Sequence, residues 1–200
     1  MKQYKSVEED IAHIRSMMAE SSRFLSLSGL SGIFAGIYAL VGATIAYKWI
    51  YIDYENGIDE NIKIRFILLA SSVLLAALST GFFFTYRNAK IRNQRIWNPS
   101  TLKFLVSLFL PLVVGGLLIL EFMYWNLGQF IAPLTLIFYG LGLWGASKYT
   151  HLETRYLALC QISLGLLSAY FVGYGLLFWA LGFGILHIIY GLVMYLKYEK

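Results

Sequence analysis

Apolar residues run along this chain in four long stretches that contain almost no charge. Between Tyr156 and Leu196 there are 41 residues without a lysine, arginine, aspartate or glutamate. Earlier stretches cover 24–47, 66–86 and 104–147, and only Glu121 interrupts the last of them. A bilayer core ~30 Å thick is crossed by about 20 helical residues that rise ~1.5 Å each. The two long stretches therefore predict two spans each and the two short ones predict one each, which makes six.

The predicted fold is all-α, a compact bundle of six transmembrane helices. Hydrophobic residues make up 58% of the chain and charged residues only 14%, which is unlike a soluble domain. The transmembrane domain is expected over 23–200, with a cytoplasmic amphipathic helix over 1–22 before it. The expected spans are 24–47, 64–86, 104–125, 130–147, 156–178 and 181–197. Little chain remains for a soluble domain with chemistry of its own.

Positive charge is concentrated on one side of the predicted membrane. The 86–103 loop carries five lysines and arginines and no acidic residue, whereas the 48–65 loop carries four acidic residues against three basic ones. Because cytoplasmic loops are enriched in lysine and arginine, both termini are predicted to lie in the cytoplasm, with the protein in a bacterial inner membrane. This placement explains the net charge of +5, so nucleic acid is not an expected partner. The 86–103 loop could also bind anionic head groups, but fixing the orientation is the simpler interpretation.

The segment before the first span reads as a short amphipathic helix. Ser6 and Glu9 have the spacing of a capping box. An apolar stripe follows at helical spacing, formed by Val7, Ile11, Ile14 and Met18. This stripe could dock a partner or sense the membrane surface. The alternative, which we favour, is a helix that lies on the inner leaflet and leads into the first span.

Small residues repeat every four positions in the first span, at Ser28, Gly32 and Gly36. This spacing places them on one helix face, where a second backbone can approach closely. The second backbone could belong to another copy of the chain or to a helix of the same bundle, and we favour the latter. Pro111 and Pro133 are expected to kink their helices.

Three polar residues inside the spans are candidates for a functional site. Glu121 lies about one turn from the outer end of its span, and a carboxylate in a membrane usually faces a cavity or a partner, unless it reaches interfacial water. His187 lies at a similar depth, so the two could form a pH-sensitive pair or a proton relay. A histidine bonded within the bundle is the alternative. Gln161 could extend such a polar lining or simply bond across helices.

Other chemistry finds little support in the residues present. Cys160 is the single cysteine, and His187 is the single histidine within a span, so no metal or haem site is predicted and no cofactor is expected. Neither a Ser-His-Asp set nor a phosphate-binding loop appears, which argues against an enzyme. The 172–175 segment, Val-Gly-Tyr-Gly, matches part of a potassium-channel filter. Its predicted location favours a glycine-rich helix end before a tight turn.

Two segments carry a resemblance to a known family. They are Met17–Gly32, which reads MMAESSRFLSLSGLSG, and Gly182–Gly191, which reads GFGILHIIYG. They resemble a family of six-span membrane proteins of Bacteroidetes-type bacteria that has no assigned activity. In span number and size the chain is also similar to acid-resistance membrane proteins of the HdeD type. The shared motifs are packing residues, so the resemblance implies an architecture and no catalytic residues.

The expected function is that of an accessory, sensory or stress-related membrane protein that works through partners or oligomerisation. Membrane lipids, a second copy of the chain or another membrane protein are the expected partners. The alternative is a small channel or transporter for a proton-linked or neutral solute, with Glu121 and His187 near its outer mouth. A transporter should lose flux in a Glu121→Gln variant, whereas an accessory protein should tolerate that change.

Overall fold

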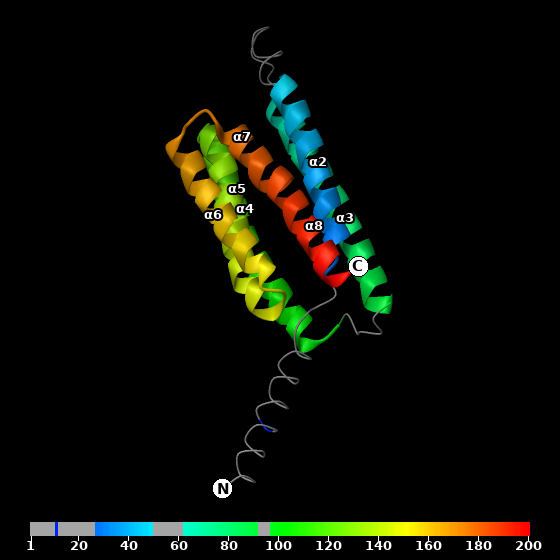
Figure 1. Ribbon diagram of the computed structural model, residues 1–200. Coiled ribbons are helices and arrows are strands. Elements are labelled where there is room, and N and C mark those ends of the chain that lie inside the picture. The colour runs from blue at the N-terminus through cyan, green and yellow to red at the C-terminus, as the bar shows by residue number, and fades with distance from the viewer. Residues whose placement is uncertain (1–10, 12–26, 50–61, 92–96) are drawn as a thin grey trace.

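The computed structural model describes residues 11, 27–49, 62–91 and 97–200, and these residues are mostly helical. Figure 1 shows the helices running side by side. They are α2 (Gly29–Lys48), α3 (Ile62–Ile91), α4 (Pro99–Tyr124), η2 (Gly128–Phe130), α5 (Ile131–Ala146), η3 (Ser147–Tyr149), α6 (Glu153–Tyr170), α7 (Gly175–Trp179), η4 (Ala180–Leu186) and α8 (His187–Tyr198). Of the predicted stripe on the N-terminal segment, only Ile11 is described, and it is exposed; Val7, Ile14 and Met18 lie outside the described residues.

Five segments in the described part are long and apolar enough to cross a membrane. They are Gly29–Lys48, Ile64–Ile91, Pro99–Tyr124, Gly128–Tyr149 and Gly175–Tyr198. The all-helical prediction, with several helices of membrane length, is therefore confirmed. α6 is not among the five, because its 18 residues include Glu153, Arg155 and Gln161. The sixth span thus stays a prediction.

The boundary between the last two predicted spans differs from expectation. α6 ends at Tyr170 rather than at residue 178, and the turn occupies 171–174 instead of the gap between the expected spans 156–178 and 181–197. Gly173 adopts a φ of 95°, a left-handed conformation that glycine reaches without a steric penalty. From Gly175 the chain is helical to Tyr198, passing through α7, the π-helical η4 and α8. The Val-Gly-Tyr-Gly segment therefore forms a turn and the start of the next helix.

The helices pack as two groups. α5 packs against α4 on one side and α6 on the other, while α2 packs against α3 and α8. The continuous α7–η4–α8 helix runs between these groups and contacts both α2 and α6 (Figure 1). α3 packs against α2 and exposes most of its remaining surface, and Ala89 is its single fully buried residue among those described.

The small-residue stripe of the first span faces another helix of the same chain. A Cβ atom added to Gly36 would lie 2.6 Å from the carbonyl oxygen of Gly184, and one added to Gly32 would lie 3.0 Å from Cα of Gly191. Ser28 is buried and its hydroxyl donates to Glu199 at 3.1 Å. Close approach of α2 to η4 and α8 thus depends on glycine on both sides.

The turn between α4 and α5 is held by backbone hydrogen bonds. Leu127 N–H donates to Phe122 O at 2.8 Å and Asn126 N–H donates to Met123 O at 3.2 Å, which is the Schellman pattern. Asn126 takes the left-handed position with φ 58°.

Pro133 is the third residue of α5, where a missing N–H removes no bond within the helix, while Pro111 lies inside α4.

Candidate functional site

A row of polar residues lies on the buried face of α6. Thr154, Gln161 and Ser168 recur every seven residues, and each is at most 2% exposed. The opposite face exposes leucines such as Leu159 and Leu166. These three buried polar groups of α6 need partners within the bundle.

His187, the first residue of α8, is the centre of the polar contacts that Gln161 reaches. The ring Nε2 lies 2.8 Å from the hydroxyl of Tyr139 on α5, and Nδ1 lies 2.9 Å from the carbonyl oxygen of Gly182 in η4. Gln161 Nε2 donates to the same carbonyl at 2.9 Å and lies 3.4 Å from Nδ1. Tyr139, Gln161, Gly182 and His187 together form what we call the His187 cluster.

The partners of His187 define its tautomer. A carbonyl oxygen only accepts, so Nδ1 carries the hydrogen that is donated to Gly182. In the neutral ring Nε2 is then the acceptor, and the Tyr139 hydroxyl donates to it. The Gly182 carbonyl has two lone pairs, which accommodate both the imidazole and the Gln161 amide. Both ring nitrogens are therefore satisfied with His187 neutral.

The π-helical segment η4 helps to build the cluster. It spans Ala180–Leu186 and directly precedes His187. Single π-turns inside α-helices are rare and often occur at functional sites. Gly182 leaves room for the Gln161 amide, because an added Cβ would lie 2.6 Å from Gln161 Oε1 and would displace this side chain. This Oε1 and the Ser168 hydroxyl are the buried side-chain oxygens without a hydrogen-bond partner in the described part of the chain.

Aromatic rings lead away from the cluster along one side of the last helix. Ring centroids are 5.7 Å apart between His187 and Phe183, and 5.1 Å apart between Phe183 and Trp179. Tyr139 joins this row at 5.1 Å from Phe183 and 5.4 Å from His187. The spacing is that of offset aromatic contacts, so the row fixes the orientation of the imidazole.

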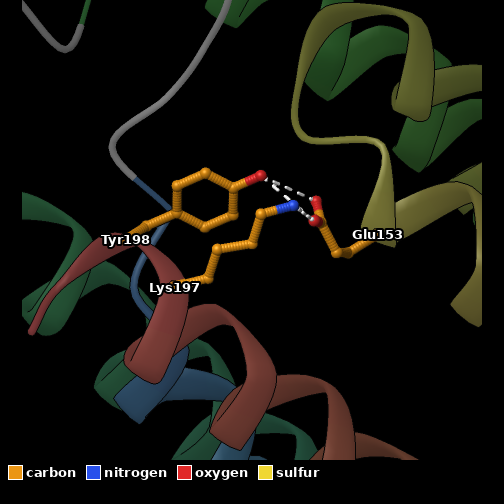
Figure 2. A network of polar contacts seen from close by, with 3 residues as sticks. All are labelled: Glu153, Lys197 and Tyr198. Carbon is orange, nitrogen blue, oxygen red and sulfur yellow. Dashed lines mark hydrogen bonds and ion pairs between the residues drawn. The ribbon is translucent and has the colours of Figure 1, made fainter.

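Further polar contacts join α6 to α8 toward the C-terminus. The hydroxyls of Thr154 and Tyr190 lie 3.0 Å apart. Near the end of the bundle, Lys197 Nζ donates to Glu153 Oε1, and the Tyr198 hydroxyl lies 3.1 Å from both carboxylate oxygens (Figure 2). Partial burial raises the pKa of Glu153, but the hydrogen bonds from Lys197 and Tyr198 outweigh it and hold the pKa below its ordinary value.

The predicted polar residues separate into two locations. Gln161 and His187 meet in the His187 cluster, as a histidine bonded within the bundle requires. Glu121 lies exposed on α4, and none of the hydrogen bonds of His187 in the described structure goes to it. The hypothesis of a Glu121–His187 pair therefore has no counterpart in the described residues. His187 packs between helices that cover it, whereas the sequence indicated only that His187 and Glu121 lie at a similar depth in the membrane.

Sequence reasoning missed four contributors to the site. Tyr139 and Tyr190 looked like ordinary aromatic residues, and Thr154 was not singled out. The repeat of Thr154, Gln161 and Ser168 at seven-residue spacing was a usable signal, because it places polar side chains on one helix face. No comparable signal marked Gly182, whose role depends on its π-helical segment.

The described residues contain no group of three histidine, cysteine, aspartate or glutamate side chains that could hold a metal ion. Comparison with known proteins adds no relative: no protein-family model, curated protein or solved structure matches the chain.

Proposed function

We propose that this chain is a six-span protein of a bacterial inner membrane that works by binding, through partners or a second copy, and carries no solute through its centre. The observation that supports this proposal is the separation of its polar groups. Both ring nitrogens of His187 are bonded within its own cluster, and Glu121 is exposed on α4, away from these bonds. A transport path would need ionisable groups that face a common passage.

The placement of side chains on α6 supports the sixth span. Its exposed surface carries Leu159 and Leu166, and Thr154, Gln161 and Ser168 are turned inward, as expected of a helix surrounded by lipid. An even number of spans places both termini on the same side, in the cytoplasm by the charge distribution. Arg155 stacks on Trp144 at 4.3 Å, near the end where the aromatic and basic residues of an interface are expected.

Cys160 provides a direct test of this sixth span. It is the single cysteine of the chain and is exposed on α6. If α6 crosses the membrane, Cys160 faces lipid and stays unmodified by a water-soluble maleimide in intact and in opened vesicles, but reacts after detergent denaturation. A Ser147→Cys, Cys160→Ser variant is the control, because residue 147 lies at the predicted inner interface and should react once vesicles are opened. Rapid modification of Cys160 in opened vesicles would contradict the six-span topology.

Flux measurements test the binding function against transport. Vesicles reconstituted with the protein should show proton and neutral-solute fluxes equal to those of empty vesicles. Glu121→Gln should insert and fold as the parent does. A flux that is present in the parent and lost in Glu121→Gln or His187→Gln would overturn the proposal.

The N-terminal stripe is the expected contact for a protein partner. Polar substitutions Ile11→Ser and Ile14→Ser should reduce recovery of a cross-linked partner, while Ala12→Ser, which lies off the stripe, should not.

The channel or transporter remains the second candidate, and the two unpartnered buried oxygens of Gln161 and Ser168 favour it because they would suit bound water. The flux measurement decides between the two.

A further inference from the structure

A cavity of about 670 Å³ lies between the α2–α3 pair and the ends of α4, α5 and α7. Its volume is in the range of ~300–1,000 Å³ that is typical of small-molecule sites. Small residues, among them Gly42, Ala46 and Ala132, keep the facing helices open at this point. The cavity is separate from the His187 cluster, but Trp179 belongs to both the cavity wall and the aromatic row that leads to His187.

The lining of the cavity defines the charge of a ligand. None of the lining residues carries an ionisable side chain. Asn126 and Gln129 lie at the turn between α4 and α5 and supply amide groups, while most of the remaining wall is apolar. Such a lining penalises an ion, because a charge would lose its hydration without gaining a counter-charge. An uncharged molecule with an apolar body and a hydrogen-bonding end suits it.

The shape of the cavity favours a ring over an extended chain. The lining residues of α3 run from Phe66 to Val73, a rise of about 10 Å. Division of the volume by this depth gives a mean cross-section of about 60 Å², which is wider than one extended alkyl chain. Trp179 also lines the cavity. A ring gains the offset or edge-to-face contact that aromatic pairs prefer when it packs against this indole, whereas an alkyl chain does not.

We propose that this cavity binds the ring of an uncharged membrane amphiphile of the quinone type. The Asn126 and Gln129 amides donate to a ring carbonyl, and the ring packs against Trp179. The inference rests on the proposed membrane location, because such a ligand reaches the cavity through the lipid. It gives the binding function a small-molecule ligand.

Photolabelling of the full chain in lipid nanodiscs tests the site. The probe is a benzoquinone with a ten-carbon tail and an azide on the ring, and labelled peptides are mapped by mass spectrometry. Label is expected on the peptides that contain Ala132 and Trp179, and an excess of unlabelled quinone should suppress it at least fivefold. Ala70→Phe, which fills the cavity from α3, should reduce labelling at least fivefold. Ala77→Phe, two turns along α3 and outside the cavity, is the matched control and should leave labelling unchanged.

Three results would overturn the inference. Labelling that does not saturate shows partition into lipid only, and equal labelling of the Ala70→Phe and Ala77→Phe variants places the probe elsewhere. Equal competition by 1-decanol, which has the same tail without the ring, identifies an alkyl-chain site. Failure of the proposed function is detected separately, because the Cys160 measurement reports on membrane topology whether or not the quinone binds.

Discussion

Gly191 lies where α8 crosses α2, and its replacement by alanine tests the packing of the bundle. The added Cβ would lie 2.5 Å from the carbonyl oxygen of Gly29 and 2.5 Å from the amide nitrogen of Ile33. Both are backbone atoms, so no side chain can rotate to make room. Ordinary contact begins near 3.4 Å, and the two helices must therefore move apart by about 1 Å.

The expected cost follows from two opposing effects. Overpacking of a close contact costs typically ~1–3 kcal/mol. Alanine also favours the helix over glycine by roughly 0.5–1 kcal/mol, which offsets part of that cost. The two ranges leave a net loss of unfolding free energy of roughly 0–2.5 kcal/mol, with a centre near ~1 kcal/mol, which corresponds to a fall in Tm of roughly 2–4 °C for a chain of this size.

Thermal unfolding in a mild detergent, followed by circular dichroism, measures this effect. Gly81→Ala is the matched control, since an added Cβ on this α3 glycine meets no atom within 4 Å. It has the same gain in helix propensity without the steric overlap, so its Tm should equal or slightly exceed that of the parent. If Gly191→Ala were as stable as Gly81→Ala, the close approach of α2 and α8 would be wrong.

Three further predictions concern the polar contacts. Tyr139→Phe removes the hydroxyl that donates to His187. A double-mutant cycle that combines it with His187→Leu should give a coupling energy of roughly 0.6–1.7 kcal/mol in chemical unfolding. The control is Tyr170→Phe, which should lose no stability because Tyr170 is 80% exposed. Because the pKa of Glu153 is lowered in the folded protein, its stabilising contribution is complete above the ordinary pKa of ~4.3 and is lost as the pH falls through the lowered pKa. Glu153→Gln should lack this part of the pH dependence of Tm, and a profile identical to that of the parent would contradict the Lys197–Glu153–Tyr198 contact. Glu199→Gln should lower stability by about 0.3–1 kcal/mol, because the Glu199 carboxylate accepts a hydrogen bond from Gly29 N–H at the positive end of α2. Lys200→Gln serves as control. Equal Tm values for the Glu199→Gln and Lys200→Gln variants would refute this capping.

The long apolar stretches predicted the helical class and most helix positions, because a helix that crosses lipid must be apolar over its length. The turn between α4 and α5 was also found, since Trp125 and Asn126 interrupt the stretch where the chain reverses. The turn at 171–174 was misplaced because no charge marks it within 41 residues. In such a stretch, Gly173 is one glycine among several, and its left-handed φ is a property of the folded chain.

The composition of the site was harder to predict than its depth. The sequence placed Gln161 and His187 within spans, and a buried polar group must find a partner. It did not indicate that the partner is Tyr139, 48 residues away from His187, because the choice of neighbouring helices depends on packing. The position of Glu121 had the same limit, since one charged residue in a helix reveals its depth but not the direction it faces.

The hydrogen bonds between Glu199 and the start of α2 have a consequence for biosynthesis. Ser28 and Gly29 are among the first described residues to leave the ribosome, and Glu199 follows Gly29 by 170 positions. At about 5–20 residues per second, this interval of translation lasts roughly 10–30 s. During that time the glycine face of α2 has no α8 to contact. The bundle therefore closes only after α8 has been synthesised, and a ribosome that stalls before α8 leaves α2 inserted with an open face on which a membrane chaperone could act.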